Sequence, residues 1–338
     1  MSGAGKTAGP YDVGGQVKAS LLDRSRTRVG MPDAEALEAT VARAVHAEQV
    51  GYDRFWVAEH HAVPGIASGT PAVLLAALGA RTHRIRIGSG GVMLPLHQPL
   101  VVAEQFLVLE ALHPGRVDLG LGRSLGFTPP VRRALRRDHE DGDTFEDDLV
   151  ELRGHLEGTA EVTARPSTGR PVPMHVLATG RGLEVAARLG LPVVVGGPVL
   201  ESPELADALS RYRRGFRPHR GSEPRVTVSL DVLVADDDAT GRELALPEAW
   251  AMARSRQTGE FPPLESIDAI RESSWPSQVR RRVEASLDRA VAGSPATVRR
   301  RLDALVEATG ADELLASSST PDRDALLASD RMLAELLR

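Results

Sequence analysis

An ordered series of strand ends between residues 53 and 126 constrains the fold of this chain more than any other feature. Three short runs, rich in Val, Ile, Leu and aromatic residues, each break into Gly, Ser, His, Glu or Arg, and patterns of helical length separate them. The runs are DRFWVAEHH (53–61), RIRIGSGGVMLP (84–95) and GRVDLGLGRSLG (115–126). Strands that alternate with amphipathic helices are typical of parallel βαβ units, and polar groups at the carboxyl ends of such strands form the active site of a (β/α)8 barrel. The pattern therefore predicts an enzyme.

The remainder of the chain continues the same alternation. Eight strands are expected, at residues 17–23, 53–61, 84–94, 116–122, 171–180, 191–197, 225–235 and 312–319. Residues 236–292 are too long for a simple connection, so we expect helices and a mobile, lid-like insertion there. The fold class predicted is α/β, a single (β/α)8 TIM barrel over 16–338 with an insertion between strand 7 and the last helices. A Gly-rich, flexible N-terminal tail is expected over 1–15.

Composition excludes several classes of function. A formal net charge of −5 over 338 residues argues against a nucleic-acid or anionic-membrane partner. The absence of cysteine excludes disulfides, thiolate catalysis and cysteine-bound metals. No apolar stretch reaches the roughly 18 residues that a membrane span needs, and the N-terminus lacks the apolar core of a secretory signal. We expect a cytoplasmic protein.

Two short motifs resemble those of other enzyme classes but lack the neighbouring strand or helix that each motif requires. GAGKT (3–7) resembles part of a phosphate-binding loop but has no strand before it and lacks the first glycine at the required spacing. Gly122–Gly126 fits the G-x-S-x-G pattern of serine hydrolases, which needs a helix directly after the serine. Pro129 and Pro130 follow instead, so neither motif predicts the function.

The Glu59-His60-His61 run stands at the end of the second predicted strand. Adjacent side chains of a strand point to opposite faces, so His60 and His61 cannot both bind one metal from an extended backbone, and we predict no metal site. One of the two histidines can face the barrel mouth and exchange a proton near neutral pH. The alternative is a hydrogen-bonded structural histidine.

Glycines interrupt the third strand, and an arginine follows the fourth. Gly88-Ser89-Gly90-Gly91 lies inside an apolar run, where glycine marks a bulge or close approach of the backbone to another group. A flat ligand ring against this backbone would explain the glycines, and a tight turn is the alternative. Arg123 follows a Gly-rich strand end, a combination that suits a phosphate, although a surface arginine is also possible.

Together, AEHH (58–61), GSGGVMLP (88–95), AEQFLVLEALHPGRVDLGLGR (103–123) and LPVVVGG (191–197) resemble the bacterial luciferase-like monooxygenase family. The resemblance is closest to its flavin-dependent subgroup found in natural-product gene clusters. It implies a (β/α)8 barrel, usually dimeric, that binds reduced FMN or, in some branches, a deazaflavin. A separate flavin reductase commonly supplies the reduced coenzyme.

The function implied is that of an oxidoreductase, a flavin-dependent monooxygenase. It would use reduced FMN and O2, acting on paired donors, to oxidise a small organic metabolite of secondary metabolism. Two alternatives stay open: a deazaflavin-dependent hydride-transfer oxidoreductase, and a non-catalytic flavin-binding protein of the same family. The partners expected are the small-molecule substrate, a flavin reductase and a second copy of the chain, with no nucleic acid and no membrane.

The resemblance also implies roles for individual residues. His60 matches the family's catalytic histidine, and we assign Glu59 to the catalytic group with it. The Gly90-Gly91 peptide matches one that is often cis in relatives and lies against the flavin ring. The chain departs from the family after the fifth strand, where it has Thr179 in place of a phosphate-binding serine. The residues expected to bind the coenzyme are Ser89, Gly90, Gly91, Arg123, Leu125, Thr179 and Gly180.

Overall fold

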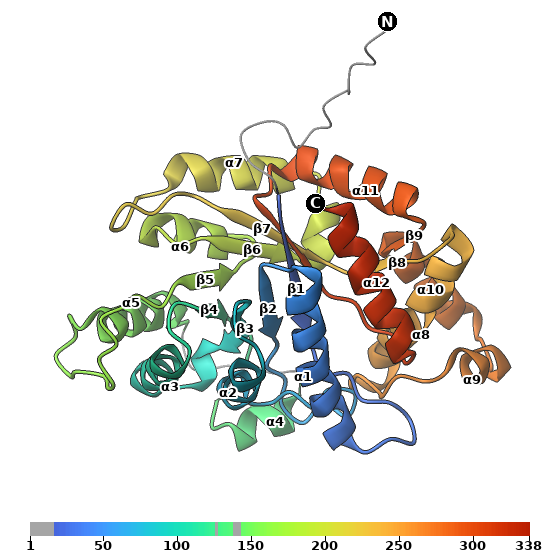
Figure 1. Ribbon diagram of the computed structural model, residues 1–338, viewed down its shortest axis with the longest axis horizontal. Helices are drawn as coiled ribbons and strands as arrows, with labels where there is room; N and C mark the ends of the chain where they lie inside the picture. The colour runs from blue at the N-terminus through green and yellow to red at the C-terminus, as the bar shows by residue number, and fades with distance from the viewer. Residues whose placement is uncertain (1–16, 126–127, 138–142) are drawn as a thin grey trace, which may run out of the picture.

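A closed barrel of eight parallel strands forms the centre of the computed structural model, and helices surround it (Figure 1). The structure describes residues 17–125, 128–137 and 143–338. The strands follow the order β1-β10-β7-β6-β5-β4-β3-β2 around the barrel. Their bounds are β1 Lys18–Asp23, β2 Arg54–Val57, β3 Arg86–Met93, β4 Val117–Gly122, β5 Met174–Leu177, β6 Val193–Gly196, β7 Val226–Leu230 and β10 Glu313–Ala316. The predicted fold class is confirmed, whereas the predicted tail at 1–15 lies outside the described residues.

The outer helices begin and end where the sequence provides the signals. Pro71 and Pro295 are the first residues of their helices, a position at which the missing N–H costs no hydrogen bond. Gly51 ends the first helix with φ of 92°, a left-handed conformation that glycine adopts readily. The outer helices are α1 Asp33–Val50, α2 Pro71–Arg81, α3 Pro99–Leu112, α4 Pro129–Ala134, α5 Phe145–Glu157, α6 Arg181–Leu189, α7 Leu205–Gly215, α11 Pro295–Thr309 and α12 Arg323–Leu336. In the described part of the chain, none of the helices has the length and apolar character of a membrane span.

The predicted seventh strand, 225–235, is two strands. Leu230 pairs with Ala316, the last residue of β10, so the barrel ladder has no further partner to offer beyond this point. The chain turns at Asp231, and β8 (Val232–Val234) pairs with β9 (Val291–Gly293) in a separate two-stranded sheet. The prediction of one long strand was wrong. A continuous apolar pattern does not show where the neighbouring strand ends, and that end decides where the barrel pairing stops.

The insertion between β8 and β9 is helical and has its own apolar core. It contains α8 (Asp238–Thr258), α9 (Ile267–Glu272) and α10 (Ser277–Arg289), and Trp250 packs with Val279 and Val283. Glu248 of α8 accepts a hydrogen bond from Nε of Arg26 at 3.0 Å and forms an ion pair with Arg24 at 3.3 Å. Both arginines follow β1, so a mostly buried charge cluster fixes α8 to the barrel. Helices were predicted here and are present; mobility of the insertion stays a prediction.

Along each strand, side chains point in turn to the barrel interior and to the surrounding helices. Leu21, Phe55, Ile87 and Leu119 are fully buried in the large apolar core outside the barrel. The intervening residues face inward and include a charged layer. Its members are Ser20, Arg54, Arg86, Asp118, His175 and Glu313. Above this layer Trp56 packs with Leu22, Leu177, Val194 and Leu315, so the end of the barrel interior nearest the strand carboxyl termini is apolar.

Candidate active site

Four neighbouring strands bring most of the predicted site residues to one arc of the barrel. β2, β3, β4 and β5 pair consecutively and in parallel, so their carboxyl ends lie side by side. His60 follows β2, Gly90 and Gly91 lie near the end of β3, Arg123 follows β4, and Thr179 follows β5. The order of these strands in the sequence is their order in the barrel, which is why the sequence could predict this grouping.

His60 lies in a half-buried, positively charged environment. Burial, followed by the charges of Arg24 and Arg26, lowers the pKa of His60 from 6.5 to about 4. The imidazole is therefore neutral at pH 7, and it can accept a proton or a hydrogen bond at an unprotonated nitrogen. Its backbone N–H donates to the carbonyl oxygen of Ser68 at 2.9 Å, which holds the segment after β2 in place.

Glu59 is buried and accepts three hydrogen bonds. Its Oε1 accepts from Nε2 of His61 at 2.6 Å and Nε2 of His97 at 2.7 Å, and its Oε2 accepts from the backbone N–H of Met93 at 2.8 Å. Burial alone would raise the pKa of Glu59, but hydrogen bonds from the two histidines, the charge of His97 and the Met93 N–H lower it to about 2. Glu59 is thus a carboxylate at pH 7, and it connects the ends of β2 and β3.

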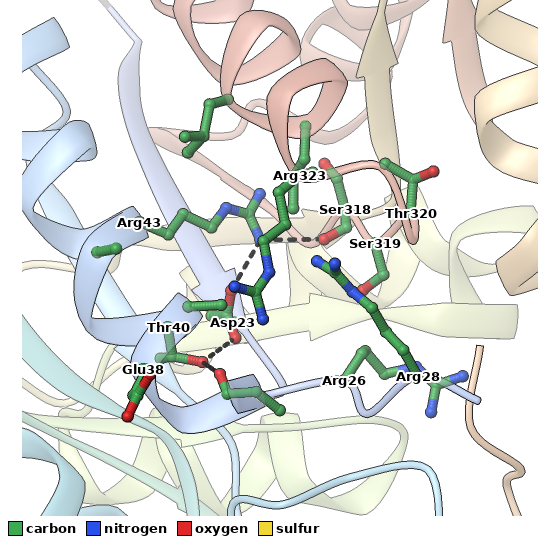
Figure 2. Close-up of a pocket in the computed structure, with 15 residues that line it drawn as sticks. Asp23, Arg26, Arg28, Glu38, Thr40, Arg43, Ser318, Ser319, Thr320 and Arg323 are labelled. Atoms are coloured by element: carbon green, nitrogen blue, oxygen red, sulfur yellow. Dashed lines mark hydrogen bonds and ion pairs between the residues drawn. The ribbon is translucent and has the colours of Figure 1, made fainter. Parts of the chain in front are cut away.

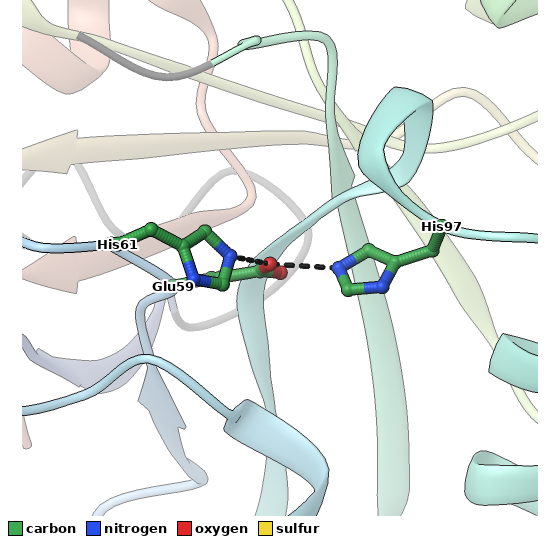
Figure 3. A group of neighbouring side chains, drawn as sticks. All are labelled: Glu59, His61 and His97. Carbon is green, nitrogen blue, oxygen red and sulfur yellow. Dashed lines mark hydrogen bonds and ion pairs between the residues drawn. The ribbon is translucent and has the colours of Figure 1, made fainter. Parts of the chain in front are cut away.

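The two histidines approach the same oxygen of Glu59 from opposite sides (Figure 3). The ligand atoms of Glu59, His61 and His97 all lie within 4.8 Å of one another, a distance that a metal ion could also bridge. Each imidazole nitrogen also lies at hydrogen-bonding distance from the carboxylate oxygen. Sequence reasoning missed His97 because it follows the short 3-10 segment Leu94–Leu96 after β3, and this stretch carries no helix or strand pattern.

The glycines of β3 lie at a bulge and at a close approach of the backbone to other groups, as glycines inside an apolar strand indicated. A Cβ atom on Gly90 would lie 2.6 Å from Cδ1 of Leu22 and 3.2 Å from Cε3 of Trp56, and one on Gly91 would lie 2.8 Å from the carbonyl oxygen of Gly120. The backbone of β4 therefore leaves no room for a side chain at Gly91, whereas a Cβ atom at Gly90 would displace the end of the Leu22 side chain. The peptide between them is cis, as the resemblance implied.

Ser89 has its side chain inside the protein. It is fully buried, and its Oγ donates to the carbonyl oxygen of Gly120 at 2.8 Å. Its backbone pairs with Val57 of β2 and Leu119 of β4, and the ladder to β4 shifts directly after it. The shift is a β-bulge in β3, and the Ser89 hydroxyl gives the Gly120 carbonyl oxygen a hydrogen-bond donor there. The side chain therefore stabilises the contact between β3 and β4.

Charged side chains and a glycine lie at the ends of β4 and β5. The half-exposed side chain of Arg123 forms two contacts with Asp143, at 3.0 Å from Nε and 2.7 Å from Nη2. Arg181 approaches the same carboxylate at 3.9 Å. Gly180, with φ of 50°, immediately precedes α6, whose first N–H groups receive no side-chain cap. Exposed Thr179 lies next to it, so cationic side chains and a hydroxyl converge here.

Leu125 is half-buried beyond the end of β4 and borders Gly126 and Phe127, which lie outside the described residues. No hydrogen bond or other described contact assigns it to the coenzyme. Its predicted role stays a prediction.

Known proteins resemble this chain over most of its length. The family model for luciferase-like monooxygenases matches residues 17–313. A luciferase-like monooxygenase of Escherichia coli K12 is 36% identical over 321 residues, covering 92% of this chain and 94% of the relative. The crystal structure of apo-MsnO8 has a TM-score of 0.85 at 33% identity, covering 95% of this chain and 98% of the other.

A further solved structure is similar in fold alone. The oxygenating constituent of 3,6-diketocamphane monooxygenase from Pseudomonas putida, in complex with FMN, has a TM-score of 0.73 at 19% identity. The similarity covers 95% of this chain and 97% of that protein. The architecture is therefore shared well beyond the range of close sequence similarity.

Proposed function

This chain belongs to the luciferase-like monooxygenase family, and from that premise we propose that it is a flavin-dependent monooxygenase that uses reduced FMN and O2 to oxidise a small organic metabolite. The observation that carries the proposal is the grouping of Arg123, Arg181 and Thr179 at the ends of β4 and β5, on the same arc as His60. Reduced FMN, when bound, would supply the electrons that activate O2.

The residues after β4 and β5 fit the phosphate of FMN. The guanidinium of Arg123 makes its described ion pair with Asp143, a side chain about one-third exposed, and an incoming phosphate can replace that carboxylate. Arg181 stands beside it. The N–H groups of Gly182 and Leu183 already donate to the carbonyl oxygens of Thr179 and Gly180, so α6 contributes the positive end of its dipole. Thr179 adds a hydroxyl where the family usually has a serine. The departure from the family pattern thus keeps a hydroxyl beside the two arginines.

The apolar end of the barrel interior suits a flat aromatic ring. Trp56, Leu22 and Leu177 pack together in the barrel interior. The Gly90 backbone lies directly against this cluster, since a Cβ atom there would lie 2.6 Å from Leu22 and 3.2 Å from Trp56. This cluster excludes water from below. In our proposal His60, neutral at pH 7, takes or returns a proton at the substrate side, and Glu59 fixes the segment that carries it.

A separate flavin reductase, a homodimeric assembly and a role in secondary metabolism belong to the same proposal, by analogy with the family. The deazaflavin-dependent alternative uses the same barrel and the same phosphate-binding groups. Measuring which coenzyme the protein binds distinguishes the FMN-dependent monooxygenase from the deazaflavin-dependent oxidoreductase.

The test compares FMN with riboflavin, which lacks the phosphate. Anaerobic titration of the purified protein with each reduced flavin, followed by absorbance, should give tighter binding of FMN. Arg123→Gln should weaken FMN binding by about tenfold, since a charge-assisted hydrogen bond contributes roughly 1.5–3 kcal/mol, and should leave riboflavin binding unchanged.

The matched control is Arg188→Gln, which removes the same charge from an exposed pair with Glu146 on the neighbouring helix. It should bind FMN as the unmodified protein does. Equal binding of FMN and riboflavin would contradict the phosphate site, and selective binding of a deazaflavin would favour the alternative enzyme.

A further inference from the structure

A pocket of about 290 Å³ lies on the other side of the barrel, between the first turns of α1 and α12 (Figure 2). It borders the carboxyl ends of β1 and β10, which are adjacent in the barrel. In the strand order, β1 and β10 lie diametrically opposite β4 and β5. The pocket is therefore separate from the proposed phosphate site of the coenzyme.

Arginines from several segments line this pocket, and two of them already have their charges balanced. Arg43 binds Asp330 and Asp23, at 2.7 and 2.9 Å, and Arg26 binds Glu248 at 3.0 Å. These two arginines belong to ion-pair clusters within the protein, so they are not the main candidates to bind an external ligand.

Arg28 and Arg323 differ from these two. No salt bridge within the described residues includes Arg28. Nη2 of Arg323 donates to the backbone carbonyl oxygen of Glu35 at 2.8 Å and reaches the Glu35 carboxylate only at 3.7 Å. Burial, followed by the neighbouring charge of Arg323, lowers the pKa of Arg28, although Glu35 and Asp322 act in the opposite direction. The two guanidinium groups therefore repel each other and lack a closely bound anion.

Buried donors at the pocket also lack acceptors. Thr320 is 2% exposed, and its Oγ1 has no hydrogen-bond partner among the described residues. Nε of Arg323 and Nη2 of Arg26 are likewise buried without an acceptor in the described part of the chain. Buried polar groups are nearly always hydrogen-bonded, and three unsatisfied donors around one pocket indicate that an acceptor from outside the chain belongs there.

The residues that line the pocket indicate the class of ligand that it can bind. Ser318, Ser319 and Thr320 come from the hydroxyl-rich loop after β10, the eighth strand of the barrel, directly before the N-terminus of α12. In TIM barrels the loops after the last strands often take part in binding phosphate. The N-terminus of α12 is capped by the Asp322 carboxylate, so the loop hydroxyls and the arginines, and not the helix end, are the donors here. The polar remainder of the lining is Thr40, which donates to Asp23, and the exposed Glu38, whose carboxylate extends into solvent. The apolar remainder consists of Ala36, Ala39, Ala42, Leu326 and Leu327.

We propose that this pocket binds a small organic anion, with its carboxylate or phosphate held by Arg28, Arg323 and Thr320 and its short apolar body against the alanines and leucines. The proposal requires neither FMN nor catalytic activity, so it stands apart from the function proposed above.

Isothermal titration calorimetry on the flavin-free protein tests it with hexanoate, hexyl phosphate and inorganic phosphate. At least one of the two hexyl anions should bind, and more tightly than inorganic phosphate because the apolar lining contributes. Tighter binding of hexanoate assigns a carboxylate head group, and tighter binding of hexyl phosphate assigns a phosphate. Binding of neither hexyl anion would overturn the proposal.

Variants locate the binding. Arg28→Gln should weaken binding of the hexyl anion by about tenfold. Thr320→Val keeps the shape of the side chain and removes a hydroxyl that has no partner, so it should bind about fivefold more weakly without loss of thermal stability. The controls are Arg331→Gln, at an exposed position of α12, and Arg123→Gln, at the proposed coenzyme site. Both should bind the hexyl anion normally. Unchanged affinity in both Arg28→Gln and Thr320→Val would overturn the proposal.

Discussion

Glu59, at the carboxyl end of β2, accepts a 2.7 Å hydrogen bond from Nε2 of His97, which follows β3. The two residues are 38 positions apart in the sequence, and their contact joins two neighbouring strand ends at the candidate active site. The same carboxylate receives the Met93 N–H, so one buried side chain determines how the segments after β2 and β3 are placed relative to each other. His60 lies directly after Glu59 and depends on this placement.

Glu59→Gln should destabilise the protein. The amide has the shape of the carboxyl group but only one acceptor oxygen, so either a histidine N–H or the Met93 N–H would face an NH2 group. We expect a loss of about 1–3 kcal/mol in the free energy of unfolding, measured by chemical denaturation at pH 7. Glu151→Gln, at an exposed position, is the control and should change stability by less than about 0.5 kcal/mol. Equal effects of the two substitutions would show that the network contributes nothing.

His60→Gln should reduce turnover without loss of folding. If the histidine transfers a proton, oxidation of substrate coupled to reduced FMN should fall by about 10²-fold or more, while the affinity for FMN stays within about twofold. The control is His83→Gln, at an exposed position before β3. Turnover within about threefold of normal in His60→Gln would remove the residue from the proton-transfer role.

Gly91→Ala and Gly122→Ala should differ sharply. The new Cβ at Gly91 would lie 2.8 Å from the backbone oxygen of Gly120, which cannot move away independently of β4. At Gly122 the nearest atom would be the Val92 oxygen at 3.8 Å, an ordinary contact. We expect Gly91→Ala to lower the free energy of unfolding by about 1–3 kcal/mol and Gly122→Ala by much less. Thermal and chemical denaturation would measure both, and similar values would refute the close-packing explanation.

His175→Gln should flatten the dependence of stability on pH. Burial lowers the pKa of His175 from 6.5 to about 4, although Asp118 acts in the opposite direction. Between these values the unfolded chain binds the proton more readily than the folded protein, so stability falls as the pH falls from 6.5 towards 4. His60 has a lowered pKa of about 4 and acts in the same direction, whereas Glu59 matters only below 4.5.

The check is the free energy of unfolding at pH 7 and pH 5 for both proteins. Glutamine does not titrate, so the variant should lose less stability than the unmodified protein between the two values. Parallel losses would show that His175 does not contribute to the acid dependence.

Local patterns in the sequence predicted the barrel and one side of its mouth. Strand and helix periodicities depend on neighbouring residues, and prolines and glycines stop or start helices through their own backbone geometry, as at Pro71 and Gly51. In a parallel barrel built in chain order, successive strand ends become neighbours, so the positions of His60 and Arg123 on one arc followed from their order alone.

Only the tertiary structure decided which groups meet. Glu59 and His97, Gly91 and Gly120, and Arg28 and Arg323 are distant in sequence, and no periodicity encodes their contacts. The break between β7 and β8 depends on where β10 ends, and the unsatisfied donors around Thr320 depend on how β1, β10 and two helices close on one another. A sequence determines local backbone preference, whereas burial, charge balance and hydrogen-bond satisfaction are properties of the closed barrel.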